Sequence, residues 1–258
     1  MHKRIPTSLA KQPLIEAVFE LRYSKETQIS EIMPGFLFHA LNCEKPITHT
    51  QASQIPKNVR DADEDMHYAV ISRLEFEGYY IGLSDHGITI SSISSNYEGW
   101  SAFKKVILRV IEEVGKLKVN ESVMRYAIKY VDFFKSNQDG SSQLDKLDLN
   151  ISLAGEDVLN DPINLRVDKN NKDYSNGIQI LSHALVLTES GTYERKGMIL
   201  DIETARYIKS DNELKDFISN TDSALDNIHQ CNLKTFFSCL KDTTIEELEP
   251  IYNNSGGS

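Results

Sequence analysis

The sequence predicts an α+β protein built of antiparallel sheets with helices packed on one face. Three observations lead to this class. Several segments alternate apolar and polar residues at period two, as half-buried strands do. Short turn-forming sequences separate them, which favours antiparallel pairing of neighbours. Other, longer segments repeat their apolar residues at the helical spacing of three and four.

The composition is that of an ordinary globular protein. The chain has 258 residues, of which 40% are hydrophobic and 26% charged, enough to bury one large core or two smaller ones. Its formal net charge of -10 argues against broad attraction to a phosphate backbone, and so against nucleic acid as the partner. The first residues lack the apolar stretch expected of a signal peptide, no apolar run reaches membrane-spanning length, and the spacing of the three cysteines fits neither a metal nor a redox motif. We therefore expect a cytoplasmic protein that does not associate with a membrane.

The stretch from Pro13 to Tyr23 is predicted to be a half-buried strand. Every second residue from Ile15 to Tyr23 forms a nearly apolar face. Glu16, Glu20 and Arg22 mark the other face. Two interpretations of this charged face stay open: a solvated surface with cross-strand ion pairs, or a surface that recognises a partner.

Residues 24 to 134 are expected to alternate helices and strands. The turn Asp85-His86-Gly87 predicts a tight hairpin, in which Gly87 is free to adopt a positive φ. The other expected elements are a helix from about Met33 to Asn42 that Pro34 disturbs, an exposed loop from Glu44 to Asp65, strands near 67–77, 79–83 and 88–93, a helix with apolar residues from Trp100 to Val114 and a cap at Ser95 or Asn96, and a strand from Val123 to Phe134.

The strand from Val123 to Phe134 carries a basic face. Arg125 and Lys129 lie on it. If this strand lies beside the opening strand, these cations meet Glu16 and Glu20 across the sheet, where opposite charges stabilise the pairing. Together with Tyr130 and Arg22, these residues form our candidate recognition surface.

Residues 136 to 142 are the predicted internal boundary, because turn residues gather there without apolar periodicity. The chain then divides into an N-terminal half of residues 1–135, a C-terminal half of residues 143–250, and a disordered tail or linker of residues 251–258. In the second half we expect strands at 147–153, 163–167, 178–188 and 198–204, a helical region over 214–240 with a break near 219–223, and a short helix that begins with the capping box Thr243 to Glu246.

The sequence lacks the common catalytic motifs. It contains no phosphate-binding glycine loop, no zinc-protease helix motif and no serine-hydrolase elbow, so we assign no catalytic residue, metal or cofactor and favour a protein that is not an enzyme. His183 and His229 are interpreted as packed or surface imidazoles. Asp201 and Glu203 share one face of a strand and are a secondary acidic candidate, because paired carboxylates bind cations or shift one another's pKa.

Several landmarks resemble a known family. They are the Pro13 to Tyr23 motif, the helix that begins at Trp100, the strand from Arg125 to Asp132, the strand from Leu200 to Glu203 and the late helix with Ile228 and His229. This combination resembles a sporadically distributed bacterial family of uncharacterised proteins. The chain departs from that pattern where it has Lys129 for arginine, Asp132 for asparagine and Glu203 for aspartate. The family's patchy distribution implies a mobile-element or antiviral, phage-defence context.

These observations lead to three functional hypotheses. The first is an interaction protein, such as an antitoxin-like regulator, specificity factor or sensor subunit, that binds the product of a neighbouring gene and can also form a homo-oligomer. The second is a small-molecule or nucleotide-handling protein, either an enzyme or a binding protein, in which Glu16, Glu20, Asp201 and Glu203 line an acidic pocket. The third is a chaperone-like protein that binds extended peptides along open sheet edges.

Overall fold

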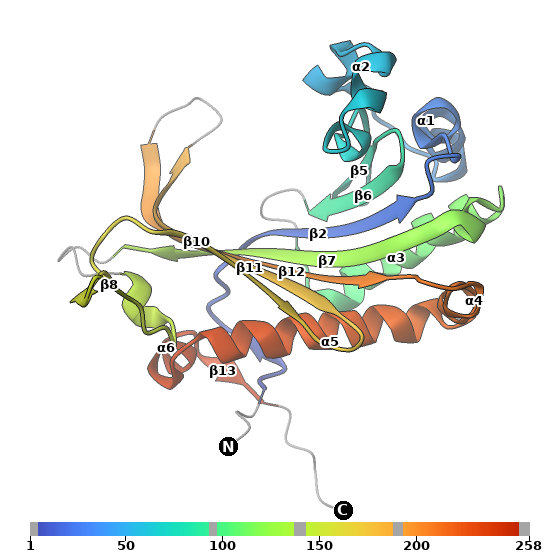
Figure 1. Ribbon diagram of the computed structural model, residues 1–258. Coiled ribbons are helices and arrows are strands. Elements are labelled where there is room, and N and C mark those ends of the chain that lie inside the picture. Colours follow the sequence, from blue (N-terminus) through green and yellow to red (C-terminus); the bar gives the residue numbers. More distant parts are fainter. Residues whose placement is uncertain (1–4, 93–96, 137–142, 188–192, 253–258) are drawn as a thin grey trace, which may run out of the picture. The chain divides into compact units, whose positions relative to one another are not determined.

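The computed structural model describes residues 5–92, 97–136, 143–187 and 193–252 (Figure 1). The predicted α+β class is confirmed. Among the described residues, nine strands form an antiparallel sheet in the order β10-β11-β12-β7-β2-β6-β5-β4-β3, with helices beside it. Two further pairs, β1 with β13 and β8 with β9, form small two-stranded sheets.

The helices are α1 (Ile29–Ala40), α2 (Lys57–Ala62), α3 (Trp100–Gly115), α4 (Asp211–Ser219), α5 (Thr221–Cys239) and α6 (Asp242–Glu247). The strands are β1 (Ser8–Leu9), β2 (Leu14–Tyr23), β3 (Thr48–His49), β4 (Ser72–Phe76), β5 (Tyr79–Leu83), β6 (Gly87–Ser92), β7 (Val123–Lys135), β8 (Ser152–Leu153), β9 (Glu156–Asp157), β10 (Asn164–Asn170), β11 (Ser175–Leu187), β12 (Tyr193–Tyr207) and β13 (Pro250–Ile251). Short 3-10 helices include η1 (Gln51–Gln54) and η2 (Met66–Tyr68). None of the helices in the described part of the chain is long and apolar enough to cross a membrane.

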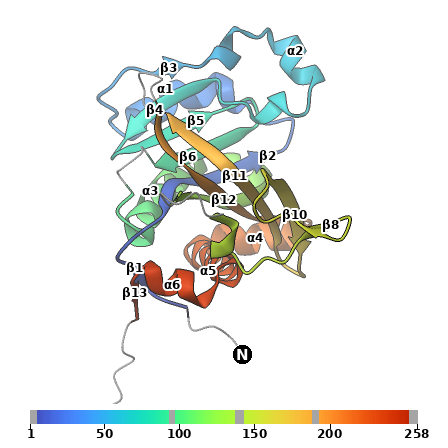
Figure 2. The same ribbon diagram turned by 90° about the vertical axis from the view of Figure 1, so that its left-hand side faces the viewer.

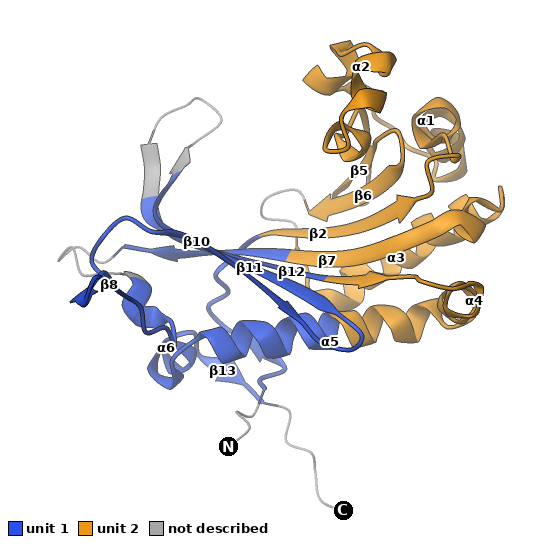
Figure 3. Cartoon of the chain, in the orientation of Figure 1, with its two compact units in different colours: residues 1–15, 130–204, 229–258 blue, residues 16–129, 205–228 orange. Residues whose placement is uncertain are grey.

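The chain divides into two compact units, but not into the consecutive halves that the sequence predicts (Figure 3). Unit 1 comprises residues 1–15, 130–204 and 229–258, and unit 2 comprises residues 16–129 and 205–228. The division falls inside β2, β7, β12 and α5. Turn residues show where the chain reverses direction, but they do not show which distant strands will pair. The predicted boundary therefore does not coincide with the division between these units. Residues 137–142 of that boundary lie outside the described residues.

In unit 2, strand β2 shows the predicted period of two. Ala17, Phe19, Leu21 and Tyr23 are at most 1% exposed, whereas Glu20 and its polar neighbours on the opposite face are partly exposed. The sheet's apolar face packs against helices, and the ring of Phe103 on α3 stacks on Tyr79 of β5 at 5.3 Å. Helix α1 begins at Ile29, earlier than expected, and includes Pro34. Pro34 is its sixth residue and lies beyond the first turn, so the helix lacks the hydrogen bond that an N–H at this position would donate to the Ser30 carbonyl oxygen.

Two turns of the β4-β5-β6 meander use glycine in different ways. The β4–β5 connection is Glu77-Gly78, and both residues have positive φ (48° and 79°), as a tight type I′ hairpin requires. The β5–β6 hairpin is confirmed, but Gly87 does not adopt the positive φ expected of it. Instead, a Cβ there would lie 2.9 Å from Ser84 Oγ and 3.2 Å from the Leu21 carbonyl oxygen. Close approach, not backbone conformation, explains this glycine.

The expectation of an exposed loop over residues 44–65 is wrong. This segment forms β3, η1 and α2, and the guanidinium-bearing side chain of Arg60 is buried in it. β3 extends the sheet through pairing of Thr48 with Arg73 and of His49 with Ser72. The prolines and mixed polar residues of this segment are typical of a loop. The ion pair that holds it, between Arg60 and Asp85, joins residues too far apart in the sequence to be recognised from a local pattern.

In unit 1, residues of β11, β12, α5 and α6 form one hydrophobic core, which includes Ile178, Leu200, Phe236 and Ile245. The predicted break near residues 219–223 is confirmed, since α4 ends at Ser219 and α5 begins at Thr221. Helix α6 begins one residue before the predicted capping box and has Lys241 as its N-cap. Within the expected strand 147–153, only Ser152–Leu153 is a strand.

The last described residues of unit 1 are ordered. Pro250 and Ile251 form β13 and pair with Leu9 and Ser8 of β1 beside α6 (Figure 2). The boundary of the predicted tail therefore needs correction, because residue 251 belongs to this small sheet. Residues 253–258, the rest of that predicted tail, and the predicted helix cap at Ser95 or Asn96 lie outside the described residues.

Candidate functional site

The charged face of β2 lies in unit 2 and is held by shared ion pairs. Arg22 donates from Nε to Glu20 Oε2 at 2.9 Å, and Arg125 donates from Nη1 to the same oxygen. β7, which carries Arg125, is the neighbour of β2 in the sheet. The predicted cross-strand pair between Arg125 and Glu20 is therefore confirmed. The side chains of Arg22, Glu20 and Arg125 are 33%, 15% and 5% exposed.

A tyrosine lies at each end of this charged group. The guanidinium carbon of Arg22 lies 4.1 Å from the ring centroid of Tyr68, which belongs to η2. The guanidinium carbon of Arg125 lies 5.6 Å from the ring centroid of Tyr207, at the end of β12. Both distances are within the range of cation–π attraction. We call the series Tyr68, Arg22, Glu20, Arg125 and Tyr207 the arginine–tyrosine ladder.

Arg22 is the member of the ladder that offers unused hydrogen-bond donors. Its Nε is bonded to Glu20, and neither Nη1 nor Nη2 makes a hydrogen bond with another described residue. The planar guanidinium presents these terminal nitrogens as a fork that matches a carboxylate or a phosphate. Stacking on Tyr68 and bonding to Glu20 hold the fork in one orientation.

The ladder is locally basic on an acidic protein. Two guanidinium groups and one carboxylate leave one positive charge in the ladder, whereas the whole chain has a formal charge of -10. Tyr207 is 52% exposed, so the ladder is within reach of a partner's surface. The arrangement suits recognition of a single acidic group more than attraction to an extended polyanion.

The remaining residues of the predicted recognition surface do not all join the ladder. Glu16 on β2 and Lys129 on β7 are half-buried. Tyr130 belongs to unit 1 and is only 6% exposed, and its hydroxyl lies 3.0 Å from His229 Nδ1. Its place on a recognition surface was predicted wrongly, because both faces of β7 are largely buried. The interpretation of His229 as a packed imidazole is confirmed.

The secondary acidic candidates lie in unit 1. Asp201 and Glu203 are half-buried on β12. Asp132 on β7 is 5% exposed, and burial, with a smaller contribution from the charge of Asp201, raises the pKa of Asp132 to about 8. In the part of the chain that the structure describes, no group of three or more His, Cys, Asp or Glu side chains could hold a metal ion.

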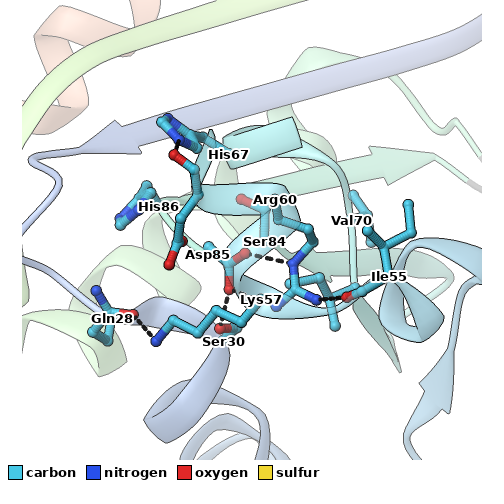
Figure 4. A network of polar contacts seen from close by, with 12 residues as sticks. Gln28, Ser30, Ile55, Lys57, Arg60, His67, Val70, Ser84, Asp85 and His86 are labelled. Carbon is cyan, nitrogen blue, oxygen red and sulfur yellow. Dashed lines mark hydrogen bonds and ion pairs between the residues drawn. The ribbon is translucent and has the colours of Figure 1, made fainter. Parts of the chain in front are cut away.

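A second polar cluster in unit 2 is buried and was missed by the sequence (Figure 4). Asp85, at the β5–β6 turn, is 0% exposed and accepts hydrogen bonds from Arg60 Nε at 2.7 Å and Nη2 at 3.2 Å. Ser30 Oγ donates to the same carboxylate at 2.6 Å. Arg60 Nη1 donates to the Ile55 carbonyl oxygen. The cluster fixes α2 and α1 to the sheet.

The charge state of this cluster follows from its contacts. Burial works to raise the pKa of Asp85, but the hydrogen bonds from Arg60 and Ser30 and the charge of Arg60 outweigh it and lower the pKa. The hydrogen bond with Asp85 raises the pKa of Arg60. Both groups are therefore ionised and satisfied. Because Asp85 is fully enclosed, the cluster is a structural anchor with no access for a ligand.

Nothing in the linear sequence links Arg60 to Asp85, or Tyr68 and Tyr207 to Arg22 and Arg125. Each pair is brought together by the fold: Ile208 N donates to Met124 O at 2.8 Å, which brings the end of β12 beside the start of β7. The one sequence feature that could have indicated the buried cluster was an arginine, Arg60, within a segment of otherwise loop-like composition.

Comparison with models of known protein families finds none that matches the chain, and comparison with curated proteins finds no significant match.

Proposed function

We propose that this chain is an interaction protein without catalytic activity, and that it binds a protein partner through the arginine–tyrosine ladder of unit 2. The observation that supports it is the unused donor fork of Arg22, fixed between Tyr68 and Glu20 at a partly exposed surface. Arginine and tyrosine are the residue types that most often dominate binding energy at protein interfaces.

The ladder is already ordered before any partner arrives. Glu20 Oε2 accepts hydrogen bonds from both Arg22 and Arg125, so neither arginine side chain loses much conformational entropy on binding. Immobilising a long side chain at an interface usually costs about 0.5–1.5 kcal/mol. Pre-organisation removes most of this cost for Arg22, and the partner gains two charge-assisted hydrogen bonds when it presents a carboxylate to the fork.

The partner should carry an acidic side chain at the centre of its own surface and apolar or aromatic groups around it. The acidic side chain neutralises the excess positive charge of the ladder. The surrounding groups cover Tyr207, which is half exposed. A neighbouring gene product is the first partner to test, in keeping with the mobile-element or phage-defence context that the family resemblance implies.

The experiment is a titration by isothermal calorimetry of the purified chain with the protein encoded beside it. We expect binding, and we expect Arg22→Ala to weaken it at least tenfold. Arg109→Ala is the matched control, because Arg109 is 46% exposed on α3 and already pairs with Glu113 at 2.9 Å. It should leave the affinity within twofold of the wild type.

Two results would contradict this proposal. Binding that Arg22→Ala and Arg109→Ala weaken equally would place the interface elsewhere. Absence of binding, together with a thermal shift from a nucleotide in a panel of mono-, di- and triphosphates that Arg22→Ala abolishes, would instead favour a nucleotide-handling protein, since the same fork also fits a phosphate.

A further inference from the structure

One edge of the sheet in unit 1 is open. β10 is the last strand in the sheet order and pairs only with β11 among the described residues. It has seven residues, Asn164 to Asn170, and all of them are exposed except the half-buried Leu165. Proline often prevents an exposed edge strand from pairing with another chain, and this strand contains none.

The pairing with β11 fixes which backbone groups of β10 are unused. Ser182 N donates to the Ile163 carbonyl oxygen at 2.9 Å, just before the first paired residue Asn164. Backbone groups of an antiparallel strand point alternately to one side and the other. Leu165, Val167 and Lys169 therefore direct their backbone groups to β11, and the residues between them direct theirs to the open side: Asn164, Arg166, Asp168 and Asn170.

This outward set is complementary to itself, because it contains Arg166 and Asp168, which carry opposite charges and within one chain lie 3.0 Å apart from Nη2 to Oδ1. In an antiparallel pair of two β10 strands related by a two-fold axis through Val167, Arg166 of each copy faces Asp168 of the other, and Asn164 faces Asn170. All four residues have their backbone groups on the open side, so the facing residues form the hydrogen-bonded pairs of the ladder. Opposite charges that face one another directly stabilise such a pair.

The geometry points to a homodimer in which β10 of one copy pairs with β10 of a second copy. We propose this contact as an interaction surface separate from the arginine–tyrosine ladder, and it does not depend on the proposed function. Seven residues at about 3.4 Å each make a contact of about 24 Å, which is short for a stable interface. The dimer should therefore be weak and depend on protein concentration.

Charge reversal tests the register. Sedimentation velocity over a range of concentrations should show the wild-type chain dimerising. Arg166→Asp alone places carboxylates opposite one another across the two-fold axis and should weaken the dimer at least tenfold, and Asp168→Arg alone should do the same with guanidinium groups. The double variant Arg166→Asp with Asp168→Arg restores opposite charges and should dimerise as the wild type does. Circular dichroism of each variant confirms that the fold is kept.

A cross-link gives a second, independent reading. Val167 directs its backbone groups to β11, so the two copies of this residue face one another as a non-hydrogen-bonded pair with a Cα separation of about 4.5 Å, which a disulfide can span. With oxidised glutathione, Val167→Cys should form a covalent dimer. Lys169→Cys is the control, because its position faces Leu165 and not itself, and it should cross-link no more than the wild type.

Three results would overturn the dimer. A wild-type chain that stays monomeric at all concentrations would show that the charges on β10 only protect an edge from aggregation. A dimer that the single and double charge variants form equally well would use another surface. Cross-linking of Lys169→Cys as efficiently as Val167→Cys would exclude the proposed register.

Discussion

Arg60 and Arg22 lie in the same unit and both bind a carboxylate, yet their surroundings differ in every respect that matters for function. Arg60 gives its donors to Asp85 and to the Ile55 carbonyl oxygen, and Asp85 is 0% exposed. Arg22 gives only Nε to Glu20 and remains 33% exposed. Each guanidinium nitrogen of Arg60 makes a hydrogen bond within the fold, whereas the two terminal nitrogens of Arg22 make none with the described residues.

The contrast shows that an ion pair alone says little about a residue's role. What distinguishes the two arginines is the number of donors left over after folding and whether solvent reaches them. A buried pair that is fully satisfied supports the structure when intact and is costly to break. A partly exposed pair such as Arg22 with Glu20 contributes less to stability than a buried one, and we propose that its fixed geometry serves partner binding.

The largest effect should come from breaking the buried pair. Arg60→Ala leaves the Asp85 carboxylate enclosed without its guanidinium, and loss of one member of such a pair typically costs about 3–5 kcal/mol. We expect a decrease of that size in the free energy of unfolding, measured by urea denaturation. A decrease below about 1 kcal/mol would mean that Asp85 finds another donor or that α2 moves to admit water.

A buried carboxylate without such a partner should behave in the opposite way. Burial raises the pKa of Asp132 to about 8 in the folded protein, from 3.8 in the unfolded chain. The folded state thus holds a proton that the unfolded state releases, so this contribution to stability is full below about pH 4 and is lost as the pH rises to about 8. Between these values the free energy of unfolding should fall with a steady slope as the pH rises.

Asp132→Asn should remove that slope, because the amide stays neutral at every pH. The variant should therefore be more stable than the wild type at pH 8, and the difference should shrink as the pH falls. Denaturation curves at pH 5, 6, 7 and 8 measure the effect. A stability difference that stays constant with pH would show that Asp132 is ionised in the folded protein.

A smaller effect is expected at the exposed end of the ladder. Tyr207→Ala removes the ring that lies 5.6 Å from the Arg125 guanidinium, and such contacts contribute about 0.5–1 kcal/mol at exposed sites. The free energy of unfolding should fall by this amount, while Tyr207→Phe, which keeps a ring, should change it less. Equal losses in both variants would mean that the hydroxyl, and not the ring, makes the contact.

The sequence predicted the parts of the fold that depend on local periodicity. The alternation in β2, the apolar spacing in α3 and the Asp85 to Gly87 hairpin each depend on residues close together in the chain, and all three elements are present. The pairing of Arg125 with Glu20 followed from charge complementarity between two predicted strands. The segment over residues 44–65 was missed because Asp85, which anchors Arg60, lies 25 residues away.

The candidate site was only partly predictable for the same reason. Glu20, Arg22 and Arg125 stood out as charges on otherwise apolar strands. Tyr68 and Tyr207 did not, because their positions beside the arginines depend on η2 and on the end of β12, which no local pattern connects to β2. Tyr130 was assigned to the surface because a strand buried on both faces cannot be told from a half-buried one by the position of a single aromatic residue.

The most direct test of the central claim is the comparison of Arg22→Lys with the wild type in stability and in affinity for the neighbouring gene product. Lysine keeps the charge but lacks the planar fork, and the partly exposed pair with Glu20 should contribute about 1 kcal/mol to folding. We predict a change in unfolding free energy no larger than that contribution and an affinity reduced at least tenfold. An unchanged affinity would contradict the claim that the fork of Arg22 holds the partner.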